Sequence, residues 1–243
     1  MVIVEEPRAF LDWHKYVQTY ERELPVIVEE CLVGQEVSVE TWSVNGEVQV
    51  LAVVDKMTTK PPYCVEVGHT TPSRLPAEQV DQLKDAATRI VRALEIENGP
   101  VHNELYMTKD GPKFVETGAR LGGGCIASHL VPLSTGIDLV EASLDFAMGN
   151  APDLTPKLSA GAALRFLQPS PGTVRANEGL ERAREMDGVV DVSCNLEPGS
   201  LVKHLQNSDQ RVGYVIAQGK DADDAARNCD AALAAITIDV DPR

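Results

Sequence analysis

The sequence is short of basic residues, of paired cysteines and of long apolar runs, and each shortage excludes a class of protein. Its 22 lysines and arginines are outnumbered by 37 aspartates and glutamates, giving a net charge of −15. This argues against nucleic acid or an anionic membrane as a partner, because both are anionic. No run approaches the 18 apolar residues of a membrane span, and the N-terminus is acidic where a signal peptide is basic. The five cysteines form no C-x-x-C pair, so we expect reduced thiols in a cytoplasmic protein.

The chain has 243 residues, 43% of them apolar, which is enough to bury a core and to form one large or two modest domains. The proline-bearing segment 151–159 offers the clearest boundary. Before it, alternating apolar residues and an Asn45-Gly46 turn signal predict an antiparallel meander. We predict an α+β protein, with an antiparallel sheet and packed helices over 1–152 and a smaller α+β domain over 158–243.

Apolar residues at helical spacing predict helices over 8–22, 76–96 and 137–148. The helix over 76–96 has a clean amphipathic pattern and is expected to be scaffold. In the helix over 137–148, Ile137, Val140, Leu144 and Ala147 are expected to face inward.

The stretch between residues 101 and 117 is expected to be a β-hairpin, with strands at 101–107 and 112–117. If residues 109–111 form a three-residue loop whose glycine is left-handed, Glu104 falls directly opposite Glu116. Like charges in that arrangement destabilise a sheet, because their Cβ atoms are about 5 Å apart. The pattern therefore predicts a cation between them, and Mg²⁺ is commonly held by one or two carboxylates plus substrate phosphates.

Arg120 follows four residues after Glu116, close enough to reach the same phosphates in a forked, charge-assisted contact. The alternative from these residues alone is a solvated hairpin with two charges on its wet face. The run Gly122-Gly123-Gly124 comes next. It indicates a close backbone approach rather than a phosphate loop, since no GK[ST] or G-x-G-x-x-G frame surrounds it.

A glutamate on one strand and E-x-x-x-R-x-G-G on the next resemble the metal-binding end of the ATP-grasp superfamily. The stretch HNELYMTKDGPKFVETGARLGGG is most similar to ligases that join amino acids or other carboxylates to amines, with carbamoyl-phosphate-synthase-like and biotin-carboxylase-like relatives. The resemblance implies an ATP-grasp fold, ATP with Mg²⁺ or Mn²⁺ as cofactors, Glu104 and Glu116 as metal ligands, and Arg120 as a catalytic cation. Many members carry a third ligand, Asn, where this chain has Gly118, which leaves two carboxylates for the metal.

In the superfamily a hinge receives adenine, and a G-x-E after it supplies a carboxylate to the ribose hydroxyls. The resemblance places the hinge at Glu29, Glu30, Cys31 and Leu32 and the ribose carboxylate at Glu36. Acceptors suit that task because hydroxyls and the exocyclic amine are donors. The alternative is that these glutamates are ordinary outward charges on a half-exposed sheet.

The proline-rich segment 56–76 is expected to be a loop over the site, with a short strand at 63–67. Within it, Glu66 and His69 resemble an E-x-G-H that lines the amino-acid pocket of the ligases. A carboxylate can grip an ammonium, and an imidazole can hydrogen-bond a carboxylate or stabilise developing charge. The resemblance thus assigns His69 to catalysis and substrate binding, together with Glu66, Arg120 and Gly123. The alternative for His69 is an ordinary loop residue.

Four basic residues outside these motifs are weaker candidates. They are Lys56 and Arg74, which could meet anionic substrate groups, and Arg165 and Lys203, which could face the cleft but are interpreted as surface charges.

The resemblance implies an ATP-dependent ligase that activates a small-molecule carboxylate as an acyl phosphate and joins it to an amine. The competing interpretations are a carboxylase of the biotin-carboxylase type and a nucleotide-binding remnant without turnover. Superfamily members carry an α/β domain and a Gly-rich, lysine-bearing loop before the hinge, and this chain starts almost at the hinge. We expect a truncation, a second chain that supplies the missing lobe, or a relic. The 243-residue chain alone is expected to bind ATP weakly, to turn it over negligibly and to self-associate through bare apolar surface.

Overall fold

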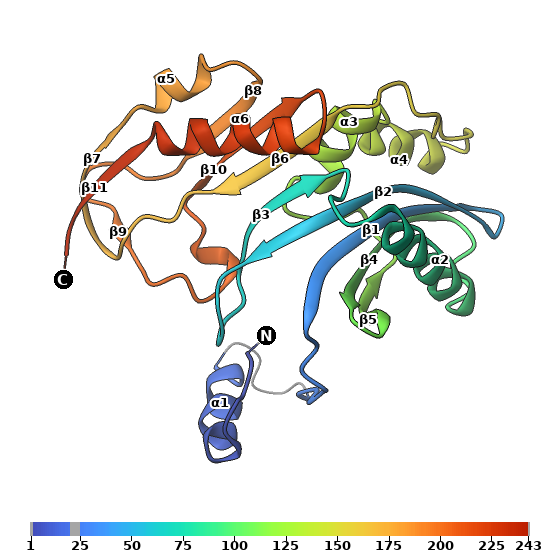
Figure 1. Ribbon diagram of the computed structural model, residues 1–243, viewed down its shortest axis with the longest axis horizontal. Coiled ribbons are helices and arrows are strands. Elements are labelled where there is room, and N and C mark those ends of the chain that lie inside the picture. The colour runs from blue at the N-terminus through green and yellow to red at the C-terminus, as the bar shows by residue number, and fades with distance from the viewer. Residues whose placement is uncertain (1, 20–24, 243) are drawn as a thin grey trace.

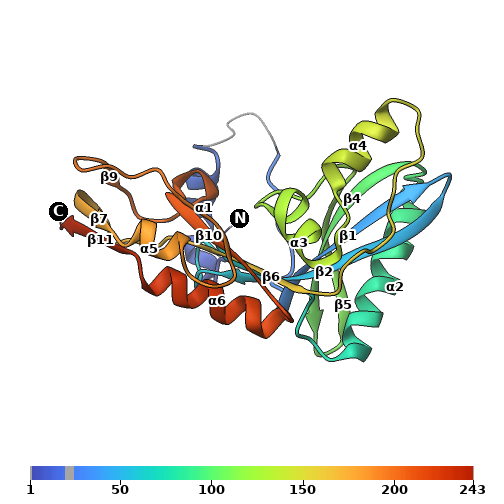
Figure 2. The same ribbon diagram turned by 90° about the horizontal axis from the view of Figure 1, so that it is seen from above.

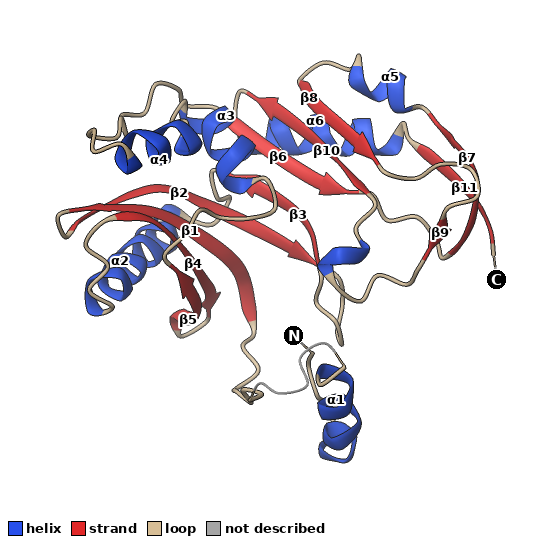
Figure 3. Cartoon of the chain, turned by 180° about the vertical axis from the view of Figure 1, so that it is seen from behind, coloured by secondary structure: helices blue, strands red, loops and turns tan. Residues whose placement is uncertain are grey.

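The structure is a computed structural model that describes residues 2–19 and 25–242. Eight strands form one antiparallel sheet in the order β5-β4-β1-β2-β3-β6-β10-β8 (Figures 1 and 3). A small antiparallel sheet has the order β11-β7-β9. The strands have these bounds: β1 Gly34–Val44, β2 Glu47–Thr58, β3 Glu66–Thr71, β4 Gly99–Thr108, β5 Gly111–Gly118, β6 Gly161–Phe166, β7 Gly172–Glu178, β8 Val189–Cys194, β9 Leu201–Val202, β10 Gly213–Gly219 and β11 Thr237–Asp241.

The helices connect and cover these strands. They have these bounds: the 3₁₀-helix η1 Pro7–Ala9, α1 Phe10–Val17, α2 Ala77–Ala93, the π-helix η2 Ile126–Leu130, α3 Val131–Thr135, α4 Leu139–Ala147, α5 Leu180–Arg184, the 3₁₀-helix η3 Ser208–Gln210 and α6 Ala222–Ala234. Helix α1 lies apart from the large sheet, near the N-terminus (Figure 1). No helix in the described part of the chain is long and apolar enough to cross a membrane.

Helices cover both faces of the large sheet, and α2 and α4 lie on opposite sides of the strands between them (Figure 2). Consecutive strand residues point to opposite faces, so Val53 belongs to the core under α2 and Val54 to the core formed with η2, α3 and α4. Helix α6 packs over β6 and β10. The helix predicted over 76–96 is confirmed as α2, which buries Leu83, Ala87 and Val91.

The hairpin between β1 and β2 is confirmed at the predicted turn. Asn45 and Gly46 have φ angles of 50° and 81°, the positive values that a two-residue type I′ turn needs at both central positions. The turn fixes the register from Val44 opposite Glu47 to Thr41 opposite Val50, and a bulge beyond Thr41 then shifts it by one residue, so that Val39 pairs with Val53.

Helix α4 confirms the predicted helix over 137–148, but its inward face differs from the prediction. Ile137, just before the helix, is buried as predicted, but within the helix Leu139 and Ala142 are buried, whereas Val140, Leu144 and Ala147 are exposed. Apolar residues lie on more than one side of this short helix, so their spacing did not determine which side would meet η2 and the sheet.

The predicted α+β class is confirmed, with an antiparallel sheet, packed helices and a smaller second sheet. Strand β3 pairs with β6, from Gly68 opposite Arg165 to Thr71 opposite Ala162. The large sheet therefore continues past the proline-bearing segment 151–159, and strands from both sides of it form one surface. The division into domains at 1–152 and 158–243 stays a prediction.

Candidate functional site

The first group of candidate residues lies in a row across four neighbouring strands. His69 on β3 pairs with Lys56 on β2, and Glu36 on β1 pairs with Tyr106 on β4. An ion pair of 2.9 Å between Lys56 Nζ and Glu36 Oε1 joins the two halves of the row, and the Tyr106 hydroxyl donates to Glu36 Oε2 at 2.9 Å. The residues assigned to ribose and to the amino-acid pocket thus meet on one surface.

Two further rows follow on the same face, because residues two apart on a strand point the same way. Glu104 on β4 pairs with Glu116 on β5, as predicted. In the next row Glu40 on β1 pairs with His102, and His102 with Gly118. The Glu104–Glu116 pair is therefore flanked on one side by the first row and on the other by a buried Glu–His pair.

The predicted three-residue loop of this hairpin is wrong, although the pairing it was used to derive is right. Thr108 pairs with Gly111 across a two-residue turn, Lys109-Asp110. The Thr108 hydroxyl closes the turn by donating to the Gly111 carbonyl at 2.8 Å and accepting from the Asp110 N–H at 3.1 Å. A bulge in β5 at Val115 then supplies the extra residue, so the register is restored at the two glutamates.

The two glutamates have different surroundings. The side chain of Glu104 is 17% exposed and that of Glu116 is 61% exposed. Arg120 lies beside Glu116, with Nη2 3.8 Å from Oε1, and its Nη1 donates to the Leu121 carbonyl at 3.1 Å. Arg120 is thus half exposed beside the hairpin of β4 and β5.

Lys56 is the centre of the charge network, although sequence reasoning ranked it low. Its side chain is 2% exposed, and Nζ lies 2.9 Å from Glu36, 2.8 Å from Glu66 and 2.9 Å from Glu104. Burial acts to lower the pKa of Lys56, but the three carboxylates outweigh it and raise the pKa above its ordinary value. The ammonium offsets the charge of Glu104 from the side away from β5, and the cation expected between Glu104 and Glu116 stays a prediction. Alternation along β2 could not mark Lys56 as buried, because residues 53–56 are buried on both faces of the strand.

His102 also contacts Glu104 and was missed by sequence reasoning. Its Nδ1 lies 2.7 Å from Glu40 Oε1, and its Nε2 lies 3.0 Å from Glu104 Oε1. Burial acts to lower the pKa of His102, but the hydrogen bonds to Glu104 and Glu40 outweigh it and raise the pKa to about 9. For Glu104, burial acts to raise the pKa, and His102 and Lys56 outweigh it and hold the pKa at about 2. The signal was the H-x-E spacing, which puts both side chains on one face of a strand.

Glu66 and His69 lie together as the E-x-G-H resemblance implies. Glu66 contacts Lys56 through Oε1 and Arg211 through Oε2, the latter at 2.9 Å, and it lies 4.0 Å from His69 Nε2. Burial acts to raise the pKa of Glu66, and its contacts with Lys56 and His69 outweigh it and lower the pKa. Arg211 had no signal in the sequence, because it reaches Glu66 from the loop after η3 and packs over the Phe166 ring at 4.2 Å.

The prediction of a loop over 56–76 with a short strand at 63–67 is wrong in part, because residues 66–71 form β3 inside the large sheet. His69 on this strand is fully buried. Neither of its ring nitrogens has a hydrogen-bond partner among the described residues, and burial lowers its pKa to about 4. The ring is therefore neutral at pH 7. Gly124 covers it closely, since a Cβ atom on Gly124 would lie 2.8 Å from Nε2. A Cβ atom on Gly123, by contrast, would meet no atom within 4 Å.

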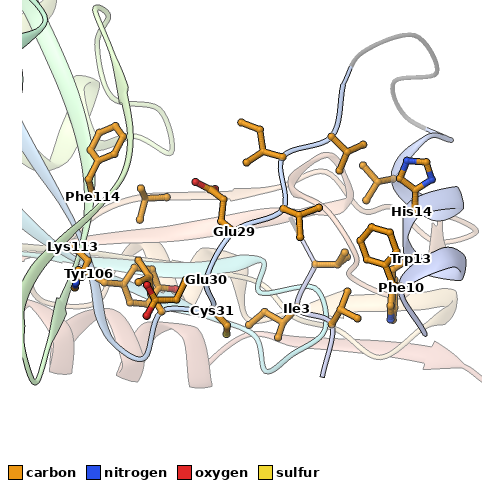
Figure 4. A pocket seen from close by; sticks show the side chains of 18 residues that line it. Ile3, Phe10, Trp13, His14, Glu29, Glu30, Cys31, Tyr106, Lys113 and Phe114 are labelled. Carbon is orange, nitrogen blue, oxygen red and sulfur yellow. The ribbon is translucent and has the colours of Figure 1, made fainter. Parts of the chain in front are cut away.

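The predicted hinge lines a cavity of about 420 Å³ at the edge of the large sheet (Figure 4). Glu29, Glu30, Cys31 and Leu32 form one wall of this cavity. The other walls come from three parts of the chain. They are β4 and β5 with Tyr106, Lys113 and Phe114, α1 with Phe10, Trp13 and His14, and the N-terminal residues 2–4. Glu36 is next to this cavity through its hydrogen bond with Tyr106.

The remaining basic candidates do not join the site. Arg74 contacts Asp55 and Asp223 at 3.6 and 3.7 Å. Lys203 is exposed, as predicted. The prediction that Arg165 is a surface charge is wrong.

Arg165 is buried where β6 pairs with β3, opposite Gly68 and in contact with Asp230 of α6. Its Nη1 donates to the His69 carbonyl at 3.0 Å, and its Nε donates to Asp230 at 2.8 Å. Arg165 therefore supports the strand that carries His69.

The donor set of the hairpin fits a hard divalent cation. Among the described residues, no three His, Cys, Asp or Glu side chains gather as a metal-binding group, and Gly118 carries no donor. Two carboxylates completed by nucleotide phosphates are a common arrangement for Mg²⁺. Each oxygen of Glu104 accepts one contact, from His102 or from Lys56, and keeps acceptor capacity for a cation.

Residues 8–128 match the family described as ATP-grasp domain, and residues 165–241 match the family described as L-amino acid ligase C-terminal domain 2. The chain is similar to the L-arginine-specific L-amino acid ligase of Bacillus subtilis, at 26% identity over 188 residues, which are 75% of this chain and 45% of that protein. It is also similar to carnosine synthase 1 of Gallus gallus, at 31% identity over 129 residues, which are 53% of this chain and 14% of that protein.

The fold is that of a solved structure, the L-amino acid ligase from Bacillus licheniformis. The two agree with a TM-score of 0.85 at 23% sequence identity, over 99% of this chain and 61% of that chain. The expectation of an ATP-grasp fold is thereby confirmed. The chain spans less than two thirds of each of these three proteins.

Proposed function

Because the chain belongs to the ATP-grasp superfamily and carries an L-amino acid ligase C-terminal domain, we propose that it forms part of an ATP-dependent carboxylate–amine ligase. ATP transfers its γ-phosphoryl group to a carboxylate, which gives an acyl phosphate and ADP. A neutral amine then attacks the acyl carbon, phosphate leaves, and loss of the amine proton gives the amide. The observation that carries the proposal is the single surface on which Glu36, Glu66 and Glu104 converge around Lys56.

The nucleotide is assigned to the cavity beside residues 29–32. Backbone groups of this segment would contact adenine, and Glu36 would accept hydrogen bonds from the ribose hydroxyls. Tyr106 and Lys56 already contact both oxygens of Glu36, so this carboxylate is oriented before a nucleotide arrives. Pre-orientation reduces the entropy lost on binding.

Glu104 and Glu116 are assigned to Mg²⁺ or Mn²⁺. When bound, the ion would neutralise charge on the nucleotide phosphates. Arg120 is assigned to the transferring phosphoryl group, because it is half exposed beside Glu116 and a guanidinium can contact two phosphate oxygens at once.

The amino-acid pocket is assigned to Glu66, His69 and the backbone of Gly123. Glu66 would contact the ammonium group of an amino acid, and Lys56 and Arg211 keep this carboxylate ionised. The neutral ring of His69 would donate a hydrogen bond to substrate or accept a proton. Since Gly124 covers the ring, Gly124 would shift to admit substrate to it.

The match of residues 165–241 favours the ligase over a biotin-carboxylase type, because it is to an L-amino acid ligase domain. A cytoplasmic location is supported by the five cysteines, all of which are unpaired thiols. Self-association, or contact with a chain that supplies further nucleotide-binding groups, is supported by the exposed apolar residues Ile27, Val28 and Val33 beside the hinge.

The test is ADP release from ATP in the presence of pairs of amino acids, measured for this chain and for the full open reading frame in which it occurs. We expect ADP release that depends on both a carboxylate and an amine, with a matching amount of amide found by mass spectrometry. ADP release that no amine stimulates contradicts the ligase. Release that depends on bicarbonate and biotin supports the carboxylase instead.

A further inference from the structure

We infer that the buried pair Glu40–His102 is a positioning device that holds the metal carboxylate Glu104 and seats the glycine segment 122–124. Neither member was predicted to have a role. The inference rests on the proposed function, since it assigns the purpose of the pair to the metal hairpin. The structure supports it with two independent contacts, one on each side of the pair.

The first contact is with Glu104. His102 lies directly opposite Glu40 on the neighbouring strand and two residues before Glu104, so both partners of the imidazole are on the same face of the sheet. The ring bridges them at 2.7 and 3.0 Å. Since Glu40 and His102 are both almost fully buried, the ring has little room to rotate. One oxygen of Glu104 is therefore held by a ring whose other nitrogen is fixed by Glu40 on β1, a strand outside the hairpin.

The second contact is with the glycine segment. A Cβ atom on Gly122 would lie 2.8 Å from Glu40 Oε2 and 2.9 Å from His102 Nδ1. The backbone of Gly122 therefore rests directly on the pair, and no larger residue fits there without displacing it. Gly123, the next residue, is assigned to substrate, so the same pair supports both the metal ligand and the backbone in front of it.

A purely structural role accounts poorly for this arrangement. Burying a carboxylate and an imidazole costs free energy through desolvation, and apolar residues of similar size often stabilise a core as well or better. Partners that orient metal ligands have a different effect, because their loss typically weakens metal binding by 10- to 100-fold. A positioning role therefore predicts a loss of metal affinity larger than any loss of stability explains.

The experiment compares two substitutions that each keep one half of the bridge. In His102→Asn the amide reproduces the position of Nδ1, which contacts Glu40, and removes the contact with Glu104. In His102→Gln the amide reproduces Nε2, which contacts Glu104. Free Mn²⁺ is measured by electron paramagnetic resonance with and without ATP, and the crystal structure of each variant reports the Glu104 rotamer. His204→Asn, at an exposed histidine, is the matched control.

We expect the apparent Kd for Mn²⁺ to rise 10- to 100-fold in His102→Asn, to rise less in His102→Gln and to stay unchanged in His204→Asn. Equal affinities in wild type and His102→Asn, with Glu104 unmoved, overturn the inference. If His102→Asn does not fold, Glu40→Gln, which keeps the shape of the carboxylate, is measured in its place, with an expected weaker binding of Mn²⁺.

Failure of the proposed function gives a different result. Glu116→Gln alters the hairpin without touching the pair, so unchanged Mn²⁺ binding in this variant rejects the hairpin as the metal site. The crystal structures still decide the inference in that case. A Glu104 side chain that leaves its position in His102→Asn supports positioning, and one that keeps it contradicts positioning.

Discussion

The buried ammonium of Lys56 lies 2.9 Å from a carboxylate oxygen of the partly exposed Glu104. The same ammonium holds Glu66 at 2.8 Å. The carboxylate assigned to metal and the carboxylate assigned to the amine substrate thus share one counter-ion. A divalent cation that binds Glu104 competes with Lys56 for that carboxylate. Binding of the metal at Glu104 therefore changes the electrostatic potential at Glu66, and binding of an amine at Glu66 changes it at Glu104.

Lys56→Met is expected to destabilise the fold strongly. Removing one member of a buried ion pair leaves uncompensated charge, which typically costs about 3 to 5 kcal/mol, and here three carboxylates lose their shared cation. The free energy of unfolding is measured by urea denaturation. Lys84→Met serves as control, because the Lys84–Asp81 pair is an exposed contact within α2 and is expected to change stability by less than about 1 kcal/mol. Adding Glu104→Gln to Lys56→Met should recover part of the loss, and a double variant that is less stable than Lys56→Met contradicts the shared-cation account.

Mn²⁺ with ATP is expected to raise the melting temperature, and Glu116→Gln is expected to abolish the rise. At a free ligand concentration 100 times Kd, binding stabilises the folded state by about 2.7 kcal/mol, or roughly 5 to 10 °C for a chain of this length. Because Glu116 is 61% exposed, its substitution should leave the melting temperature without ligand unchanged. Glu47→Gln, at an exposed position of β2, should retain the full rise. A rise that survives in Glu116→Gln would show that the metal binds elsewhere.

Stability is expected to fall between pH 6.5 and pH 4 through His69. The folded pKa of about 4 lies below the ordinary value of 6.5, so within this window the unfolded chain binds a proton that the folded chain does not. The contribution of the neutral ring is therefore present above pH 6.5 and is lost as the pH falls towards 4. Between pH 7.5 and 4.5 the wild type should lose about 2 to 3 kcal/mol more than His69→Gln.

The measurement for His69 is urea unfolding at half-unit pH steps. His204→Gln, at an exposed position, is expected to follow the wild type throughout. Parallel curves for wild type and His69→Gln would mean that the ring reaches solvent or a partner in the folded state.

Self-association is expected to depend on the apolar residues beside the hinge rather than on those of α4. Ile27 and Val28 are 78% and 69% exposed, and Ile27→Asp with Val28→Asp should shift the sedimentation equilibrium towards monomer. Leu144→Asp with Met148→Asp is the matched control, because α4 carries exposed apolar residues of similar size. The opposite pattern, with only the α4 variant becoming monomeric, would assign the contact to α4.

The sequence by itself determined the features whose geometry depends on residues close together in the chain. The Asn45-Gly46 turn, the scaffold helix α2 and the pairing of Glu104 with Glu116 all follow from local pattern, and E-x-x-x-R-x-G-G was enough to identify the superfamily. Even there, the pairing of the two glutamates came out right because a bulge at Val115 offset a turn shorter than predicted.

The rest of the site was decided by strands that meet only in the folded chain. Lys56 reaches Glu66 and Glu104, His102 bridges Glu40 and Glu104, and Arg211 reaches Glu66 across the joint between β3 and β6. These contacts depend on strand order and on burial, and a sequence pattern of period two specifies which residues share a face but not which strands lie side by side. The surroundings then determine the charge of each histidine. Burial lowers the pKa of His69 and keeps its ring neutral, whereas Glu40 and Glu104 raise the pKa of His102 and keep that ring charged.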